Sequence, residues 1–229
     1  MVDPVVADYI VEGLLVANCK PAPARLDDLL RLCTRALLDG KLDLEVRGKR
    51  AAALLDGTGT ARFLQLRHSV FSSENGFDNS WVSLSIAPSE SHERAILGVG
   101  VHLGKLGDQV GVEWDAGLQI ARRLTQLKVF ELAFLSGRPV DVERAALPSE
   151  KSYAHRDIPT VFAAWTFIGG GRTQGASPPV PAKLTAHSAG PWSGGLEVQA
   201  VKHLLDSPPK SFVEQLSSGW SASFMPPLR

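Results

Sequence analysis

Residues 25–40 read RLDDLLRLCTRALLDG, and the spacing of the apolar side chains in this stretch decides the fold class. The apolar residues recur at i, i+3, i+4 and i+7: Leu26, Leu29, Leu30, Cys33 and Leu37. This spacing is typical of an amphipathic helix, and Gly40 is placed to end it. Because such a helix must bury its apolar face, the strand-like run at residues 9–17 is the first candidate partner.

Several segments on either side of the helix predict a sheet. Strand-like segments lie at residues 51–55, 63–68, 81–86, 97–103, 110–114, 183–185 and 196–198, and residues 161–168 form a continuous apolar run. The first two, and 97–103 with 110–114, are expected to pair as hairpins. The continuous run is typical of a buried central strand. Glycines at alternate positions 98, 100 and 104 indicate that a helix presses on that face.

Two further helices are expected, one over residues 115–127 and one over residues 199–216 that is broken at Pro208-Pro209. The order of elements predicts an α+β fold: a mixed or mainly antiparallel sheet packed by about three helices. With 229 residues the chain fits one domain, residues 1–229. The Gly/Pro-rich stretch GGGRTQGASPPVP at residues 169–181 is expected to be a flexible connection within that domain.

Composition restricts the function. The 24 Lys and Arg residues balance 24 Asp and Glu residues, so general affinity for a nucleic-acid backbone is not expected. Two cysteines, Cys19 and Cys33, are too few for a disulfide scaffold. No run approaches the roughly 20 apolar residues of a membrane span, and the first residues lack a signal-peptide pattern. We therefore expect a cytoplasmic protein with no membrane partner.

Three motifs have some of the features of a reacting centre. GPWSGG at residues 190–195 is similar to the Ser-Gly-Gly of trypsin-like proteases. Pro191, however, removes a backbone N–H that the oxyanion hole needs. Ser193 is therefore better interpreted as part of a glycine-rich turn. His155 and Asp157 form an H-x-D pair that could bind iron with His203, or lie in a solvated loop. GGGR at residues 169–172 lacks the following helix that a phosphate loop requires. No catalytic residue, metal site or cofactor is predicted.

The order of segments resembles that of bacterial polymorphic-toxin immunity proteins, in particular immunity protein fifty-two. The likeness lies in YIVEGLLVA before a Leu-rich helix, SVFSSENGFDNSWVSLSI at residues 69–86, and a helix ending near residues 130–134. AAWTFIGGG followed by SPPVPAKL continues it toward a terminal helix. The sequence departs from the family's usual Trp-Asn-Gly at residues 72–79 and lacks its Trp-Asp-Pro after the second helix.

The resemblance implies a non-catalytic inhibitor that binds a cognate protein toxin made by the same cell. Binding of this kind depends on a few aromatic or charged anchors in an interface of about 1,600 Å². The candidates, expected to be exposed in loops, are Glu74, Phe77, Asp78, Arg172, Trp192 and Trp220.

Two alternatives remain open at this point. The first strand and helix could begin an RNA-binding subunit of a CRISPR-type effector complex, in which GGGRTQG contacts the RNA backbone. The chain could also be a metal-dependent enzyme that uses the His155/Asp157 pair.

Overall fold

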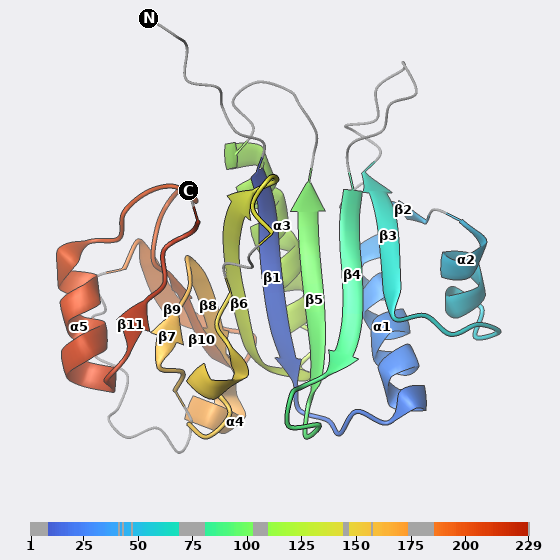
Figure 1. The fold of residues 1–229 in the computed structure, drawn as a ribbon, viewed down its shortest axis with the longest axis horizontal. Helices are drawn as coiled ribbons and strands as arrows, with labels where there is room; N and C mark the ends of the chain where they lie inside the picture. The colour runs from blue at the N-terminus through green and yellow to red at the C-terminus, as the bar shows by residue number, and fades with distance from the viewer. Residues whose placement is uncertain are drawn as a thin grey trace, which may run out of the picture.

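The computed structural model describes residues 9–40, 42, 44–46, 48–68, 81–102, 110–143, 147–156, 158–173 and 186–228. Within them, one nine-stranded sheet has the order β2-β3-β4-β5-β1-β6-β8-β10-β9 (Figure 1). Its strands are β1 (Tyr9–Ala17), β2 (Leu44–Val46), β3 (Phe63–His68), β4 (Trp81–Pro88), β5 (Ala95–His102), β6 (Phe130–Pro139), β8 (Trp165–Ile168), β9 (Ser188–Trp192) and β10 (Gly195–Gln199). Neighbouring strands in this sheet are antiparallel.

The helices are α1 (Pro23–Leu38), α2 (Lys49–Leu55), α3 (Val110–Thr125), α4 (Gly170–Thr173) and α5 (Lys210–Trp220), with a 3₁₀ turn at Glu150–Ser152. A separate parallel pair joins β7 (Val161–Phe162) to β11 (Ser223–Phe224). The chain is thus a single α+β domain with a mainly antiparallel sheet, as the sequence predicts. No described helix has both the length and the apolar character needed to span a membrane.

Helices α1 and α3 cover one face of the sheet, behind the strands in Figure 1. The centre of this layer is the contact of α3 with β1. A Cβ atom added at Gly117 on α3 would lie 2.6 Å from Cγ1 of Val11, so the helix backbone comes very close to the strand. The residues on this face, such as Leu15, Leu97 and Ala133 of neighbouring strands, are fully buried in the one hydrophobic core.

The described elements cover only one half of the other face. Over β6 and β8, the Tyr153 ring lies 5.7 Å from the Phe134 ring, and Trp220 of α5 stacks on Phe162 at 5.2 Å. Over β3, β4 and β5, no described element lies in front of the sheet (Figure 1). A Cβ atom at Gly98 would meet Oγ of Ser85 at 2.5 Å. The glycines of β5 therefore accommodate side chains of β4, and the expectation of a helix pressed on them is wrong.

Four other expectations differ from the structure. Residues 51–55 belong to helix α2, because the segment KRAAALL is made of good helix formers. Residues 110–114 begin α3 rather than a strand. The alternation of apolar and polar residues there predicts a strand with Glu113 facing solvent, but Glu113 is buried in the structure. The run at 161–168 splits into β7 and β8 at a turn where the Ala163 N–H donates to Oγ1 of Thr166. Residues 199–205 are not helical, and the strand expected at 183–185 lies outside the described residues.

Candidate functional site

A β-bulge in β6 creates the most distinctive polar feature of the sheet. Val16 pairs with Leu132 and Ala17 pairs with Phe130, so Glu131 has no opposite residue on β1. A bulged residue leaves the regular alternation of side chains, which allows its side chain to be aimed elsewhere. The N–H of Gly169, just after β8, donates to the Glu131 carbonyl at 2.9 Å. The bulge thus presents Glu131 at the end of the sheet where β8 also terminates.

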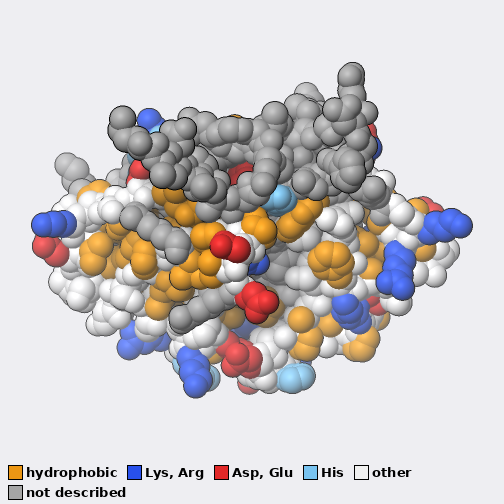
Figure 2. All heavy atoms as spheres, turned by 45° about the horizontal axis from the view of Figure 1, so that its top comes forward, with side chains coloured by type: hydrophobic (Ala, Val, Ile, Leu, Met, Phe, Trp, Pro, Cys, Tyr) orange, Lys and Arg blue, Asp and Glu red, His pale blue; other side chains and the backbone are white. Residues whose placement is uncertain are grey.

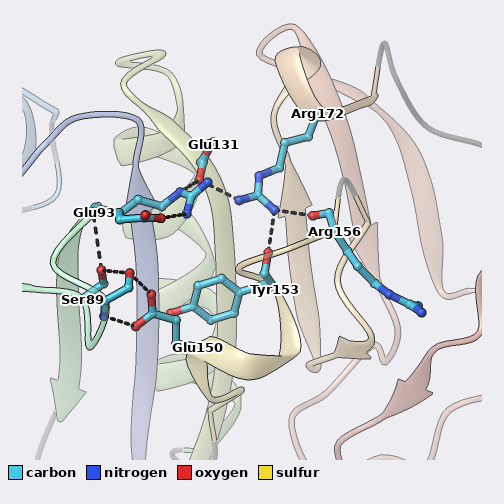
Figure 3. A network of polar contacts seen from close by, with 9 residues as sticks. Ser89, Glu93, Glu131, Glu150, Tyr153, Arg156 and Arg172 are labelled. Atoms are coloured by element: carbon cyan, nitrogen blue, oxygen red, sulfur yellow. Dashed lines mark hydrogen bonds and ion pairs between the residues drawn. The ribbon is translucent and has the colours of Figure 1, made fainter.

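Two arginines share the Glu131 carboxylate (Figure 3). Its Oε1 atom accepts hydrogen bonds from Nε of Arg94 and, at 2.7 Å, from Nη2 of Arg172. Nη1 of Arg172 also donates to the carbonyl oxygens of Tyr153, at 2.9 Å, and Arg156, at 2.6 Å. The cluster joins the β4–β5 turn, β6, α4 and the segment around residue 153. Since charge-assisted hydrogen bonds are stronger than neutral ones, it holds these four segments together.

A second carboxylate extends the network. Glu150 accepts hydrogen bonds from the hydroxyl of Ser91 at 2.5 Å and from its backbone N–H at 3.2 Å. Burial alone would raise the pKa of Glu150, but the hydrogen bonds from Ser91, Glu90 and Ser89 together outweigh it and leave that pKa below its ordinary value. Burial, together with the nearby charges of Glu150 and Glu90, raises the pKa of Tyr153 to about 12, so its phenol stays protonated.

Beside this cluster lies a pocket of about 450 Å³, which we name the basal pocket. It is lined by Asn18, Lys128, Val129, Phe130, Glu131, Phe167, Gly169, Gly170, Gly171, Arg172, Ser193 and Gly194. Phe130 and Phe167 are buried and give the pocket an apolar part. Lys128 is exposed at its edge. The pocket therefore combines apolar surface with positive charge, and its volume is within the usual range of ligand sites.

Two residues of the basal pocket have a left-handed backbone although neither is glycine. The φ angle is 58° at Lys128 and 47° at Ser193. Both are bonded to the carbonyl of Thr125 at the end of α3: the Lys128 N–H donates at 3.1 Å and the Ser193 hydroxyl at 3.0 Å. Non-glycine residues in this conformation are uncommon and are enriched at functional sites.

Next to the pocket, Trp192 is held in a fixed position. Its Nε1 donates to Oγ1 of Thr125 at 3.1 Å, and the Arg122 guanidinium lies 5.7 Å from the centre of its ring. Arg122 is fixed in turn by a 2.7 Å hydrogen bond to Glu197, which also accepts from Nε1 of Trp165 at 2.6 Å. Arg122 and Trp192 therefore form a cation–π pair whose geometry is fixed by contacts within the chain.

A comparison with solved structures finds a protein of similar fold. The chain is similar to the Pseudomonas aeruginosa T6SS protein PA0821, a protein of the type VI secretion system. The likeness covers 95% of this chain and 73% of that chain, with a TM-score of 0.52 and 13% identical residues. At this identity the similarity establishes the fold. No model of a protein family matches the sequence, and a search of curated proteins finds no match.

The structure places three of the six predicted anchors. Arg172 lies in α4 and Trp220 ends α5, and they are only 8% and 5% exposed, so the expectation that both are exposed in loops is wrong. Their burial has a plain cause, because Arg172 bonds to Glu131 and Trp220 stacks on Phe162. Trp192 is half-buried at the end of β9 beside the basal pocket. Glu74, Phe77 and Asp78 lie outside the described residues.

The other motifs are also located. Ser193 and Gly194 form the turn between β9 and β10, in line with the interpretation of GPWSGG as a turn. His155 and His203 are exposed and Asp157 lies outside the described residues. In the part of the chain that the structure describes, no three His, Cys, Asp or Glu side chains are grouped to hold a metal ion.

Sequence reasoning did not select Lys128, Glu131 or Arg122. One signal was present for Glu131, which is the only charged residue in the apolar run VFELAFL at residues 129–135. A lone charge in a buried strand requires a partner, and here that partner is a pair of arginines. No comparable signal marks Lys128, because a left-handed turn at a lysine has no sequence pattern.

Proposed function

We propose that this chain is a non-catalytic immunity protein, which binds a bacterial toxin and so neutralises it. The observation that carries the proposal is the fold shared with a T6SS protein over 95% of this chain. A bacterium that delivers toxins must protect itself from its own, and an inhibitor encoded with the toxin provides that protection. The sequence resemblance to immunity proteins points independently to the same role.

The architecture of the basal pocket supports this proposal. Tight inhibition depends on side chains that are already ordered in the free protein, because immobilising them on binding costs free energy. The side chains of Trp192 and Arg122 are held in this way: Trp192 bonds to Thr125, Arg122 bonds to Glu197, and the two stack on each other. Tryptophan and arginine are also the residue types that contribute most to protein interfaces.

The proposal is tested by capture of the partner. The tagged chain is expressed in its native host, recovered under mild conditions, and the bound protein is identified by mass spectrometry. We expect a stoichiometric complex with one toxin domain, encoded beside the gene for this chain, that re-forms from the two purified proteins. Failure of that toxin domain to bind the purified chain would contradict the proposal. So would a salt-dependent complex with RNA, or stoichiometric iron or zinc accompanied by turnover of a substrate.

A further inference from the structure

We infer that the basal pocket, together with Trp192 and Arg122, is the surface that receives an acidic segment of the protein partner. Carboxylates of that segment contact Lys128, and an apolar side chain beside them enters the pocket against Phe130 and Phe167. The inference rests on the proposed function and identifies the site at which the toxin docks.

Charge is the first observation behind it. The basal pocket and its neighbour Trp192 are surrounded by four cations and three carboxylates: Arg94, Arg122, Lys128 and Arg172, and Glu93, Glu131 and Glu197. All three carboxylates are already paired with arginines, so the surplus charge is that of Lys128. Lys128 has no carboxylate partner among the described residues. This end of the sheet therefore carries surplus positive charge on a chain whose formal net charge is zero, and an acidic partner is electrostatically complementary to it.

The backbone of Lys128 is the second observation. With φ at 58°, this position would be occupied at lower energy by glycine. The turn nevertheless carries a long cationic side chain, which is exposed at the edge of a pocket. Strain retained at a pocket is consistent with a function for the side chain that bears it.

The bare face of β3, β4 and β5 is a less specific surface. Phe63 on β3 is 58% exposed there. In the view of Figure 2, charged side chains of both signs lie interspersed among hydrophobic ones. In Figure 2 that face shows no dominant charge among the described residues, whereas the basal pocket combines an unpaired lysine with a defined cavity.

Two substitutions test the surface without removing a buried interaction. Lys128→Glu reverses an exposed charge. Gly171→Asp adds a carboxylate at the pocket, where a Cβ atom on Gly171 would meet nothing within 4 Å, and Gly171→Asn is its neutral match. Lys49→Glu is the control, because it makes the same charge change at a distant position. Lys49 lies on α2, which packs beside β3 near the opposite edge of the sheet.

Titration of the captured toxin domain into each variant measures the effect. We expect Lys128→Glu to weaken binding by at least about tenfold, and Gly171→Asp to weaken it by about fivefold more than Gly171→Asn does. Lys49→Glu should stay within about twofold of the unmodified chain, because screening limits the reach of a distant surface charge. The losses should shrink as salt concentration rises.

Cross-linking identifies the occupant directly. A carbodiimide joins an amine to a carboxylate without a spacer, so it links Lys128 only to an acidic residue in contact with it. On the complex, we expect a linked peptide that contains Lys128 and an Asp or Glu of the toxin, and its loss in the Lys128→Gly variant.

The outcomes separate the two proposals. If no toxin domain binds, the proposed function fails and the inference fails with it. If the toxin binds Lys128→Glu and Gly171→Asp as tightly as the unmodified chain, the function stands and the inference is overturned. Loss of a dimer of this chain in Lys128→Glu, or occupation of the pocket by inorganic phosphate or an RNA oligonucleotide in place of the toxin, would also overturn it.

Discussion

Lys128 has opposite effects on stability and on the proposed binding site. Its left-handed backbone destabilises the fold, while its side chain supplies the charge at the basal pocket. We predict that Lys128→Gly raises the free energy of unfolding by up to about 1 kcal/mol, because glycine adopts this conformation without a steric penalty. Urea unfolding measures the change. The matched variant Ser221→Gly, at a left-handed residue that ends α5, should be stabilised similarly and should leave toxin binding unchanged.

Loss of stability in Lys128→Gly would show that the native turn favours lysine for a structural reason. Retention of full toxin affinity in that variant would show that the lysine charge is not used.

Glu150 makes stability depend on acid pH. Because the pKa of Glu150 is lowered in the folded chain, it stabilises the fold above its ordinary pKa of about 4.5, and this contribution is lost as pH falls through the lowered value. We predict that Ser91→Ala, which removes the hydroxyl donor to Glu150, destabilises the chain at pH 7 by about 1 to 2 kcal/mol. The difference from the unmodified chain should narrow at acid pH, as the pH falls below the lowered pKa of Glu150 and its carboxylate becomes protonated. An equal difference at pH 7 and at acid pH would contradict this role.

At the scale of elements, the backbone of α3 packs very closely against β1. Alanine at Gly117 would favour the helix locally, yet its Cβ would lie 2.6 Å from Val11 Cγ1. We predict that Gly117→Ala destabilises the chain by about 1 to 3 kcal/mol, because overpacking outweighs helix propensity. The double variant with Val11→Ala should lose less than the sum of the two single variants, as measured by urea unfolding. If the losses of unfolding free energy were additive, the destabilisation by Gly117→Ala would not come from contact with Val11.

Elements whose sequence pattern is set by one buried face were predictable. The helix at residues 25–40, and the strands at 9–17, 63–68 and 81–86, correspond to α1, β1, β3 and β4. Residues 51–55 and 110–114 were misassigned, because short apolar runs do not distinguish helix from strand and because Glu113 is a buried polar residue in α3.

The candidate site was far less predictable. It depends on a bulge at Glu131, a left-handed turn at Lys128 and the meeting of β6, β8 and the β9–β10 turn at one end of the sheet. Each of these follows from tertiary pairing, which local propensity does not encode. Of the residues around this site, the sequence predicts only Trp192 and Arg172 as anchors, and it predicts an exposure of Arg172 that the structure does not show.

At the scale of the whole molecule, the sheet joins segments from both sides of residues 169–181. β8 precedes this connection, and β10 follows it and pairs directly with β8. We therefore predict that limited proteolysis within residues 169–181 leaves the two fragments in one compact body. The fragments should elute together from a size-exclusion column and separate only in denaturant. Release of two independently folded pieces would show that the chain holds two domains.

The central claim, that the molecule acts by binding a toxin, is tested most directly by bacterial growth. A susceptible bacterium expresses the toxin domain encoded beside this chain, with or without the chain itself. The account predicts that growth stops with the toxin alone and is restored when this chain is co-expressed, in proportion to its amount. Growth arrest that persists when the folded chain is in excess over the toxin would contradict the account.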